Sequence, residues 1–199
     1  MGAVRAPAAA VRRALVPFFA AWCCHAHAAP PLPPSVAAQL PAGYLPFVAQ
    51  TGPALADGRH SLLVVVHRAV DTRERPSPRP LLIYEEQADH TYRLTARNDS
   101  VVLHANDALQ CDPFDPEDAA DGGIAVKGRY FTVQNDVACG QHWSDYVTFR
   151  YDPRTHGWVF ASQIYTESFP LEPDKPDFVS SVRADAHRPV SFSQWQRKE

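Results

Sequence analysis

Apolar and polar residues alternate along much of the chain with a period of two, which places successive side chains on opposite faces of a β-strand. Residues 92–97, 146–151 and 158–164 follow this pattern and predict strands with one wet face. Residues 62–66 form a continuous apolar run rich in β-branched side chains, which is typical of a strand buried on both faces. Residues 81–84 are a second apolar run and predict another strand.

Turn signals separate these runs. Lys127-Gly128 lies between the apolar positions of residues 124–126 and 131–133 and predicts a hairpin with glycine in the turn. The turn-rich residues 152–157 predict a second hairpin. Residues 70–80 carry three prolines and several charges, so we expect an exposed loop there.

Helical periodicity is almost absent. Ser35 is a candidate cap for a short helix over residues 36–40, which Pro41 would end. The fold class expected is mainly β: an antiparallel sandwich, or a curled, propeller-like sheet, of about eight or nine strands.

The predicted organisation has four parts. A cleaved signal peptide over residues 1–28 precedes a Pro-rich lead-in and short helix at 29–39. The antiparallel β-domain covers 40–165. A Pro-rich segment over 166–199 ends the chain, with a candidate last strand at 190–195.

The first residues have the features of an export signal. Three arginines precede a run of about nine apolar residues at 14–22, which is too short to span a membrane. Ala26-His27-Ala28 fits the small-x-small rule and predicts cleavage after Ala28. We expect a periplasmic or secreted protein. Lipoprotein anchoring through Cys23 is the alternative, although Trp22 fits poorly before a lipidated cysteine.

Composition excludes some classes of function. The chain has 199 residues, of which 45% are hydrophobic, and a net charge of −3, so a disordered chain is not expected. Cleavage would leave 16 basic and 22 acidic residues, a net charge of −6. The negative net charge does not favour nucleic-acid binding, which depends on clustered Lys and Arg side chains. No later apolar stretch predicts a membrane span.

Cleavage would also remove two of the four cysteines. Cys111 and Cys139 remain, and in an oxidising compartment such a pair predicts a disulfide. The sequence has no Cys-x-x-Cys motif that would favour a redox or metal site.

Several short motifs follow one another over roughly residues 40–165, at 40–45, 52–66, 79–83, 92–98, 112–114, 127–128 and 146–151. Their order resembles a group of uncharacterised bacterial exported proteins and lipoproteins related to the FG-GAP and VCBS repeats of β-propellers. The resemblance implies a calcium loop of the form Asp-x-Asn-x-Asp-Gly-x-x-Asp, of which only Asp57 and Gly58 remain. Ca²⁺ takes about six to eight oxygen ligands. We therefore expect a plain turn there and predict no metal and no cofactor.

Two groups of residues are candidates for binding. One is an acidic loop that follows Cys111; its members are Asp112, Asp115, Glu117, Asp118 and Asp121. The other is a set of tyrosines on the predicted polar strand faces, Tyr130, Tyr146 and Tyr165. If those faces align, an exposed tyrosine stripe would bind a glycan or a partner protein. The acidic loop is also readable as a solvated loop or a cation site.

The sequence contains no convergent catalytic set. His142, Ser144 and Asp145 include the residue types of a triad, but strand alternation puts Asp145 on the opposite face from the other two. We expect a non-catalytic binding or structural protein of the bacterial cell envelope, with an envelope protein or glycan as its partner. The alternative is an envelope hydrolase, which requires a histidine and an acid in one deep pocket, or a hydrolase inhibitor with a protruding loop at residues 111–123.

Overall fold

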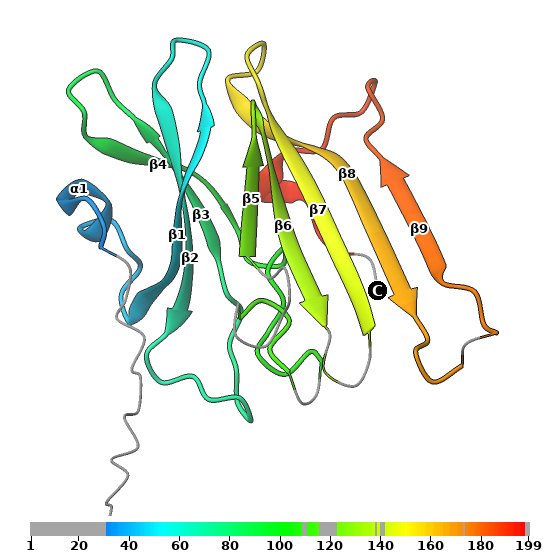
Figure 1. The fold of residues 1–199 in the computed structure, drawn as a ribbon. Coiled ribbons are helices and arrows are strands. Elements are labelled where there is room, and N and C mark those ends of the chain that lie inside the picture. Colours follow the sequence, from blue (N-terminus) through cyan, green and yellow to red (C-terminus); the bar gives the residue numbers. More distant parts are fainter. Residues whose placement is uncertain are drawn as a thin grey trace, which may run out of the picture.

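The chain forms two antiparallel β-sheets that pack face to face as an open sandwich (Figure 1). The computed structural model describes residues 31–108, 111–115, 123–137, 139, 142–172 and 174–197. The predicted mainly-β class is confirmed, in its sandwich form. The predicted signal peptide, its cleavage after Ala28 and the alternative anchor Cys23 lie outside the described residues.

Strand order follows chain order in both sheets, so each neighbouring pair within a sheet is a hairpin. The four-stranded sheet consists of β1 (Tyr44–Ala54), β2 (His60–Arg68), β3 (Leu81–Glu86) and β4 (Tyr92–Asn98). The five-stranded sheet consists of β5 (Gly123–Lys127), β6 (Tyr130–Val137), β7 (His142–Asp152), β8 (Gly157–Ser168) and β9 (Phe178–Arg183). The described helices are α1 (Pro34–Ala37) and the 3₁₀ helix η1 (Phe192–Gln194).

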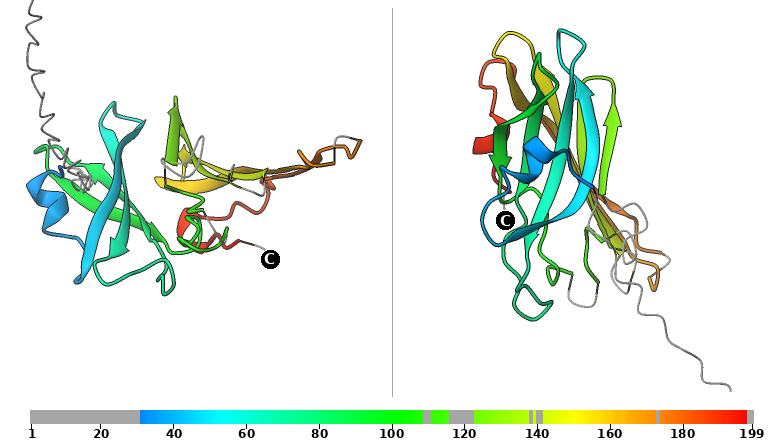
Figure 2. Two further views of the ribbon diagram at one scale, coloured as in Figure 1. Left: turned by 60° about the horizontal axis from the view of Figure 1, so that its bottom comes forward. Right: turned by 90° about the vertical axis from the view of Figure 1, so that its left-hand side faces the viewer.

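Strand β2 is buried on both faces, as its apolar run predicted. Leu63 and Val65 face the core between the sheets. Val64 and Val66 face the other way, into a second apolar cluster that also contains Val36 of α1. This short helix therefore covers the outer side of the four-stranded sheet (Figure 2).

The short helix begins two residues earlier than expected and ends at Ala37. Pro33 is its N-cap and Pro34 its first residue, where a proline fits because the N–H there has no helical partner. Ser35 is not the cap: its hydroxyl accepts a hydrogen bond from the backbone N–H of Tyr92 at 3.0 Å. The side chain thus ties the helix to β4.

Strand β1 has no pattern that predicted it, because prolines interrupt its sequence. Pro46 and Pro53 lie at the two places where the β1–β2 register shifts. β1 is an edge strand, and prolines are tolerated at edges and bulges because a missing N–H costs no ladder hydrogen bond there.

The C-terminal part departs from the prediction. β8 continues to Ser168, and β9 lies inside the Pro-rich C-terminal segment, at residues where no strand was predicted. The expected strand at 190–195 is instead a single bridge from Ser191 to Val159, followed by η1. Phe192 and Trp195 of this segment are buried in the main core, so residues 190–197 close the side of the sandwich between β4 and β8.

The five-stranded sheet extends beyond the four-stranded one. Strands β8 and β9 reach past the sandwich, and the C-terminal segment passes beside them (Figure 2). All six residues of β9 are exposed. We use "inner face" for the face of this sheet that points toward the core and "outer face" for the opposite one.

Candidate functional site

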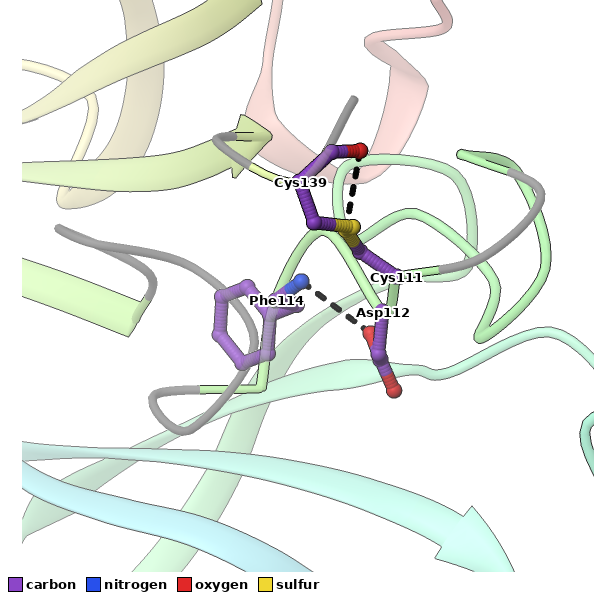
Figure 3. Close-up of a disulfide and its surroundings, with 4 residues drawn as sticks. All are labelled: Cys111, Asp112, Phe114 and Cys139. Atoms are coloured by element: carbon purple, nitrogen blue, oxygen red, sulfur yellow. Dashed lines mark hydrogen bonds between the residues drawn. A yellow bond between two sulfur atoms is a disulfide. The ribbon is translucent and has the colours of Figure 1, made fainter. Parts of the chain in front are cut away.

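The first acid of the predicted acidic loop has a structural partner. Cys111 and Cys139 form a disulfide with Cα atoms 6.2 Å apart (Figure 3). The carboxylate of the next residue, Asp112, is buried against the guanidinium of Arg79, which donates to Oδ1 at 2.7 Å and also to Oδ2. Asp112 Oδ1 also accepts the backbone N–H of Phe114 at 3.1 Å. Asp112 therefore holds the loop onto the sandwich and does not face a ligand.

Of the other acidic residues in this loop, the structure describes Asp115 alone. Asp115 is partly buried in the same turn, where its N–H donates to the carbonyl of Asp112 at 3.3 Å. Glu117, Asp118 and Asp121 lie outside the described residues.

Asp57 and Gly58 form the turn between β1 and β2. Gly58 has φ +84°, a conformation that favours glycine. The guanidinium of Arg59 donates to the Asp57 carboxylate at 2.7 Å, and this bond lowers the pKa of Asp57. In the part of the chain that the structure describes, no group of three or more His, Cys, Asp or Glu side chains could hold a metal ion.

The three candidate tyrosines do not share one face. Tyr130 and Tyr146 lie on the outer face, but Tyr165 lies on the inner face, so the faces do not align and the three tyrosines form no single stripe. The cause is a bulge at Ala161: Thr148 pairs with Ser162 and Phe149 with Phe160, which leaves one extra residue on β8.

The displaced tyrosine joins two other aromatic side chains. The ring of Tyr165 lies 6.2 Å from that of Trp143 on β7 and 6.3 Å from that of Phe178 on β9. We call Trp143, Tyr165 and Phe178 the aromatic row. Its rings cross three neighbouring strands on the inner face, and Phe178, at the free edge, is 52% exposed. The sequence pattern does not reveal the grouping of Trp143 and Phe178 with Tyr165, because this grouping depends on the bulge.

Polar groups border the aromatic row. Glu167 stands opposite both Trp143 and Phe178 in the strand register, and Ser180 stands opposite Tyr165. Burial, followed by the charge of Glu167, raises the pKa of Tyr165, so its hydroxyl remains a hydrogen-bond donor at neutral pH.

A hollow with both apolar and charged lining residues continues from the row along the inner face; its charged residues are Arg183, Asp185 and Arg188. It has a volume of about 340 Å³ and lies between β8–β9 and the C-terminal segment. Val182 and Trp195 line it, together with Gln163, which is two residues from Tyr165 on the same face.

A second cavity, which we call the hairpin cleft, is lined by residues of the β1–β2 and β7–β8 turns and of strands β3 and β4. Both turns lie at the same end of the sandwich (Figure 1). The volume of the cleft is about 690 Å³, and its charged and titratable lining residues are Asp57, Arg59, Glu85, Arg93, Tyr151 and His156. The indole N–H of Trp158 donates to Glu85 Oε1 at 3.1 Å and orients that carboxylate. Burial, and then the Glu85 carboxylate, raises the pKa of Tyr151.

The triad-like residues of β7 are separated as strand alternation predicted. The hydroxyl of Ser144 bonds that of Thr166 at 2.5 Å on the outer face. The carboxylate of Asp145 lies on the inner face, where it binds Gln163 at 2.7 Å and the guanidinium of Arg197. Burial lowers the pKa of Arg197 to about 10, so the guanidinium remains charged opposite Asp145 at neutral pH.

No protein-family model matches the chain, and neither a curated protein nor a solved structure matches it. None of the helices that the structure describes is long and apolar enough to cross a membrane. The aromatic row and the hairpin cleft are therefore the features from which a function is inferred.

Proposed function

We propose that this protein is an exported, non-catalytic binding protein of the bacterial cell envelope, and that its ligand is a glycan bound along the aromatic row. The observation that carries the proposal is the line of Trp143, Tyr165 and Phe178 across three neighbouring strands of the inner face. Trp143 is half-buried against the cluster of Ala108, Cys111 and Val137, Tyr165 is half-buried, and Phe178 at the free edge is exposed. A group of large apolar side chains that reaches the surface beside polar neighbours is typical of an interaction surface.

The chemistry of the row suits sugars. The C–H face of a pyranose packs on an aromatic ring, and the tip of a tyrosine stays available for hydrogen bonding. Glu167 and Ser180 offer acceptors and a donor to sugar hydroxyls beside the rings. The hollow at Val182 and Trp195 offers an apolar recess for a substituent such as an N-acetyl group. An oligosaccharide of N-acetylated amino sugars satisfies all three features.

The test uses the mature chain from Ala29 with its disulfide intact. Calorimetric titration with chitotetraose, and with cellotetraose as the matched sugar that lacks acetamido groups, measures affinity and acetyl preference. We expect Tyr165→Ala and Phe178→Ala to weaken binding about tenfold each, equivalent to about 1.4 kcal/mol.

The control is Val179→Ala, which truncates a 63% exposed side chain on the other face of β9. It should bind like the unmodified protein. Failure of the unmodified protein to bind either sugar, or equal binding by the Tyr165 and Phe178 variants, would contradict the proposal.

A second candidate function is an envelope hydrolase, which the hairpin cleft favours because His156 lines the same cavity as Asp57 and Glu85. A histidine and a carboxylate are the groups that general acid–base catalysis uses most. The test is hydrolysis of chromogenic ester, peptide and glycoside substrates. Activity lost in both His156→Asn and Glu85→Gln supports this candidate, and no hydrolysis by the unmodified protein contradicts it.

A further inference from the structure

A third cavity lies on the outer face of the five-stranded sheet, opposite the aromatic row. It has a volume of about 570 Å³, within the usual range of small-molecule sites. Three arginines line it, Arg150 from β7, Arg154 from the β7–β8 turn and Arg183 from the end of β9. We call it the arginine pocket.

One buried carboxylate organises two of these arginines. The side chain of Asp152 is only 3% exposed, and its Oδ2 lies 3.4 Å from Arg154 Nη2 and 3.9 Å from Arg150 Nη1. The backbone N–H of Arg154 donates to Asp152 at 3.0 Å, which lowers the pKa of this carboxyl. Asp152 is therefore ionised and holds both guanidiniums near the cavity before any ligand arrives.

The charges do not cancel. Arg183 forms no ion pair within the described residues, and it stands opposite Ser162 on the outer face. Asp185 is the one acid among the lining residues that the structure describes, and its Oδ1 accepts the backbone N–H of His187 at 2.8 Å. Three guanidiniums against the carboxylates of Asp152 and Asp185 leave a surplus of one positive charge.

The remaining lining suits the body of a small molecule. Tyr130 and Ile164 are exposed side chains beside the arginines, and Ser162 adds a hydroxyl. The geometry points to a second binding site, which takes a compact organic anion with its carboxylate or phosphate group on the guanidiniums and its body against Tyr130 and Ile164. Arginine is the side chain that matches the planar, two-oxygen edge of such groups.

The experiment compares charged sugars with their neutral counterparts by calorimetric titration at low ionic strength. Glucose 6-phosphate is paired with glucose, and galacturonate with galactose, so the two pairs separate a phosphate ligand from a carboxylate ligand. We expect at least one charged sugar to bind and both neutral sugars to bind at least tenfold more weakly. Added salt should weaken the charged complex.

Two variants locate the binding. Arg183→Gln and Arg154→Gln each remove one guanidinium with an exposed side chain, so both should fold normally, and each should weaken the bound anion at least tenfold. Arg75→Gln is the control, because it removes the same charge from the exposed loop between β2 and β3. Equal binding of charged and neutral sugars, no binding of either charged sugar, or unchanged binding in the Arg183 and Arg154 variants would overturn the inference.

Discussion

At the residue scale, the least exposed ion pair among the described residues joins the disulfide loop to the four-stranded sheet. The side chains of Arg79 and Asp112 are 9% and 6% exposed, and the guanidinium of Arg79 also lies 4.9 Å from the ring centroid of Phe47. Two charges removed from water in this way depend on each other, because either one alone would be buried without compensation.

We expect Asp112→Ala to lower the free energy of unfolding by about 3–5 kcal/mol, since it leaves the Arg79 guanidinium buried and unpaired. Urea unfolding measures the change. Asp99→Ala is the matched control: it breaks the exposed pair with Arg97 and should cost less than about 1 kcal/mol. Equal losses of stability in the two variants would show that the buried pair contributes no more than the exposed one.

The titration of His67 should make stability depend on pH. Burial, followed by the charge of Arg79, lowers the pKa of His67 in the folded protein below its ordinary value near 6.5. The unfolded chain therefore takes up the proton first, and the free energy of unfolding falls as the pH drops below about 6.5. It levels off once the pH is below the folded pKa.

His67→Gln removes this titration. Urea unfolding at pH 7.5 and at pH 5 should show a smaller loss of stability in the variant than in the unmodified protein. An identical loss in both proteins would assign the pH dependence to other groups.

At the element scale, one asparagine joins the C-terminal segment to β4. The side-chain amide of Asn98 donates to the carbonyls of Phe192 at 2.6 Å and Trp195 at 2.7 Å. Its Oδ1 accepts the backbone N–H groups of Ser100 and Val101, each at 2.9 Å. A single buried side chain thus joins the end of β4 to η1.

Asn98→Ala should lower the free energy of unfolding by about 2–4 kcal/mol, because several buried backbone groups lose their partner at once. Hydrogen exchange at residues 192–197 should speed up more than exchange in β6 and β7. Ser193→Ala serves as the control, since its hydroxyl accepts one long bond, 3.4 Å, from the N–H of Arg97. Unchanged hydrogen exchange in the Asn98 variant would contradict the view that this side chain holds the C-terminal segment on β4.

The β1–β2 hairpin needs glycine at two positions for different reasons. A Cβ at Gly52 would collide with the side chain of Ser61, while a Cβ at Gly58 would meet open space. Gly58 instead requires a positive φ. We expect Gly52→Ala to cost about 1–3 kcal/mol through overpacking and Gly58→Ala about 1 kcal/mol through backbone strain. Thermal unfolding of the two variants would separate these effects, and a neutral Gly52→Ala would contradict the packing argument.

At the scale of the whole molecule, the disulfide between Cys111 and Cys139 closes a loop that contains strands β5 and β6 and the last part of the connection from β4 to β5. In the chain-entropy model, this closure stabilises the fold by about 3.5 kcal/mol. Cys111→Ala should lower the free energy of unfolding by about this amount in urea. Free alkylation of both cysteines in the native protein would contradict the pairing.

The sequence by itself determined the properties that depend on local patterns. Period-two alternation predicted the mainly-β class, the apolar run predicted burial of β2 on both faces, and Lys127-Gly128 predicted the β5–β6 turn, where Gly128 has φ +59°. These properties follow from side-chain alternation and turn chemistry, which act over a few residues.

Only the tertiary structure decided which side chains meet. One bulged residue at Ala161 turns Tyr165 to the inner face and assembles the aromatic row with Phe178, which lies in a strand that local composition did not predict. The partners of Asp112 and Asn98 are 33 and more than 90 residues away along the chain. Such contacts depend on sheet register and on how the two sheets pack, which a period of two does not encode because a slip of one residue moves every side chain to the other face.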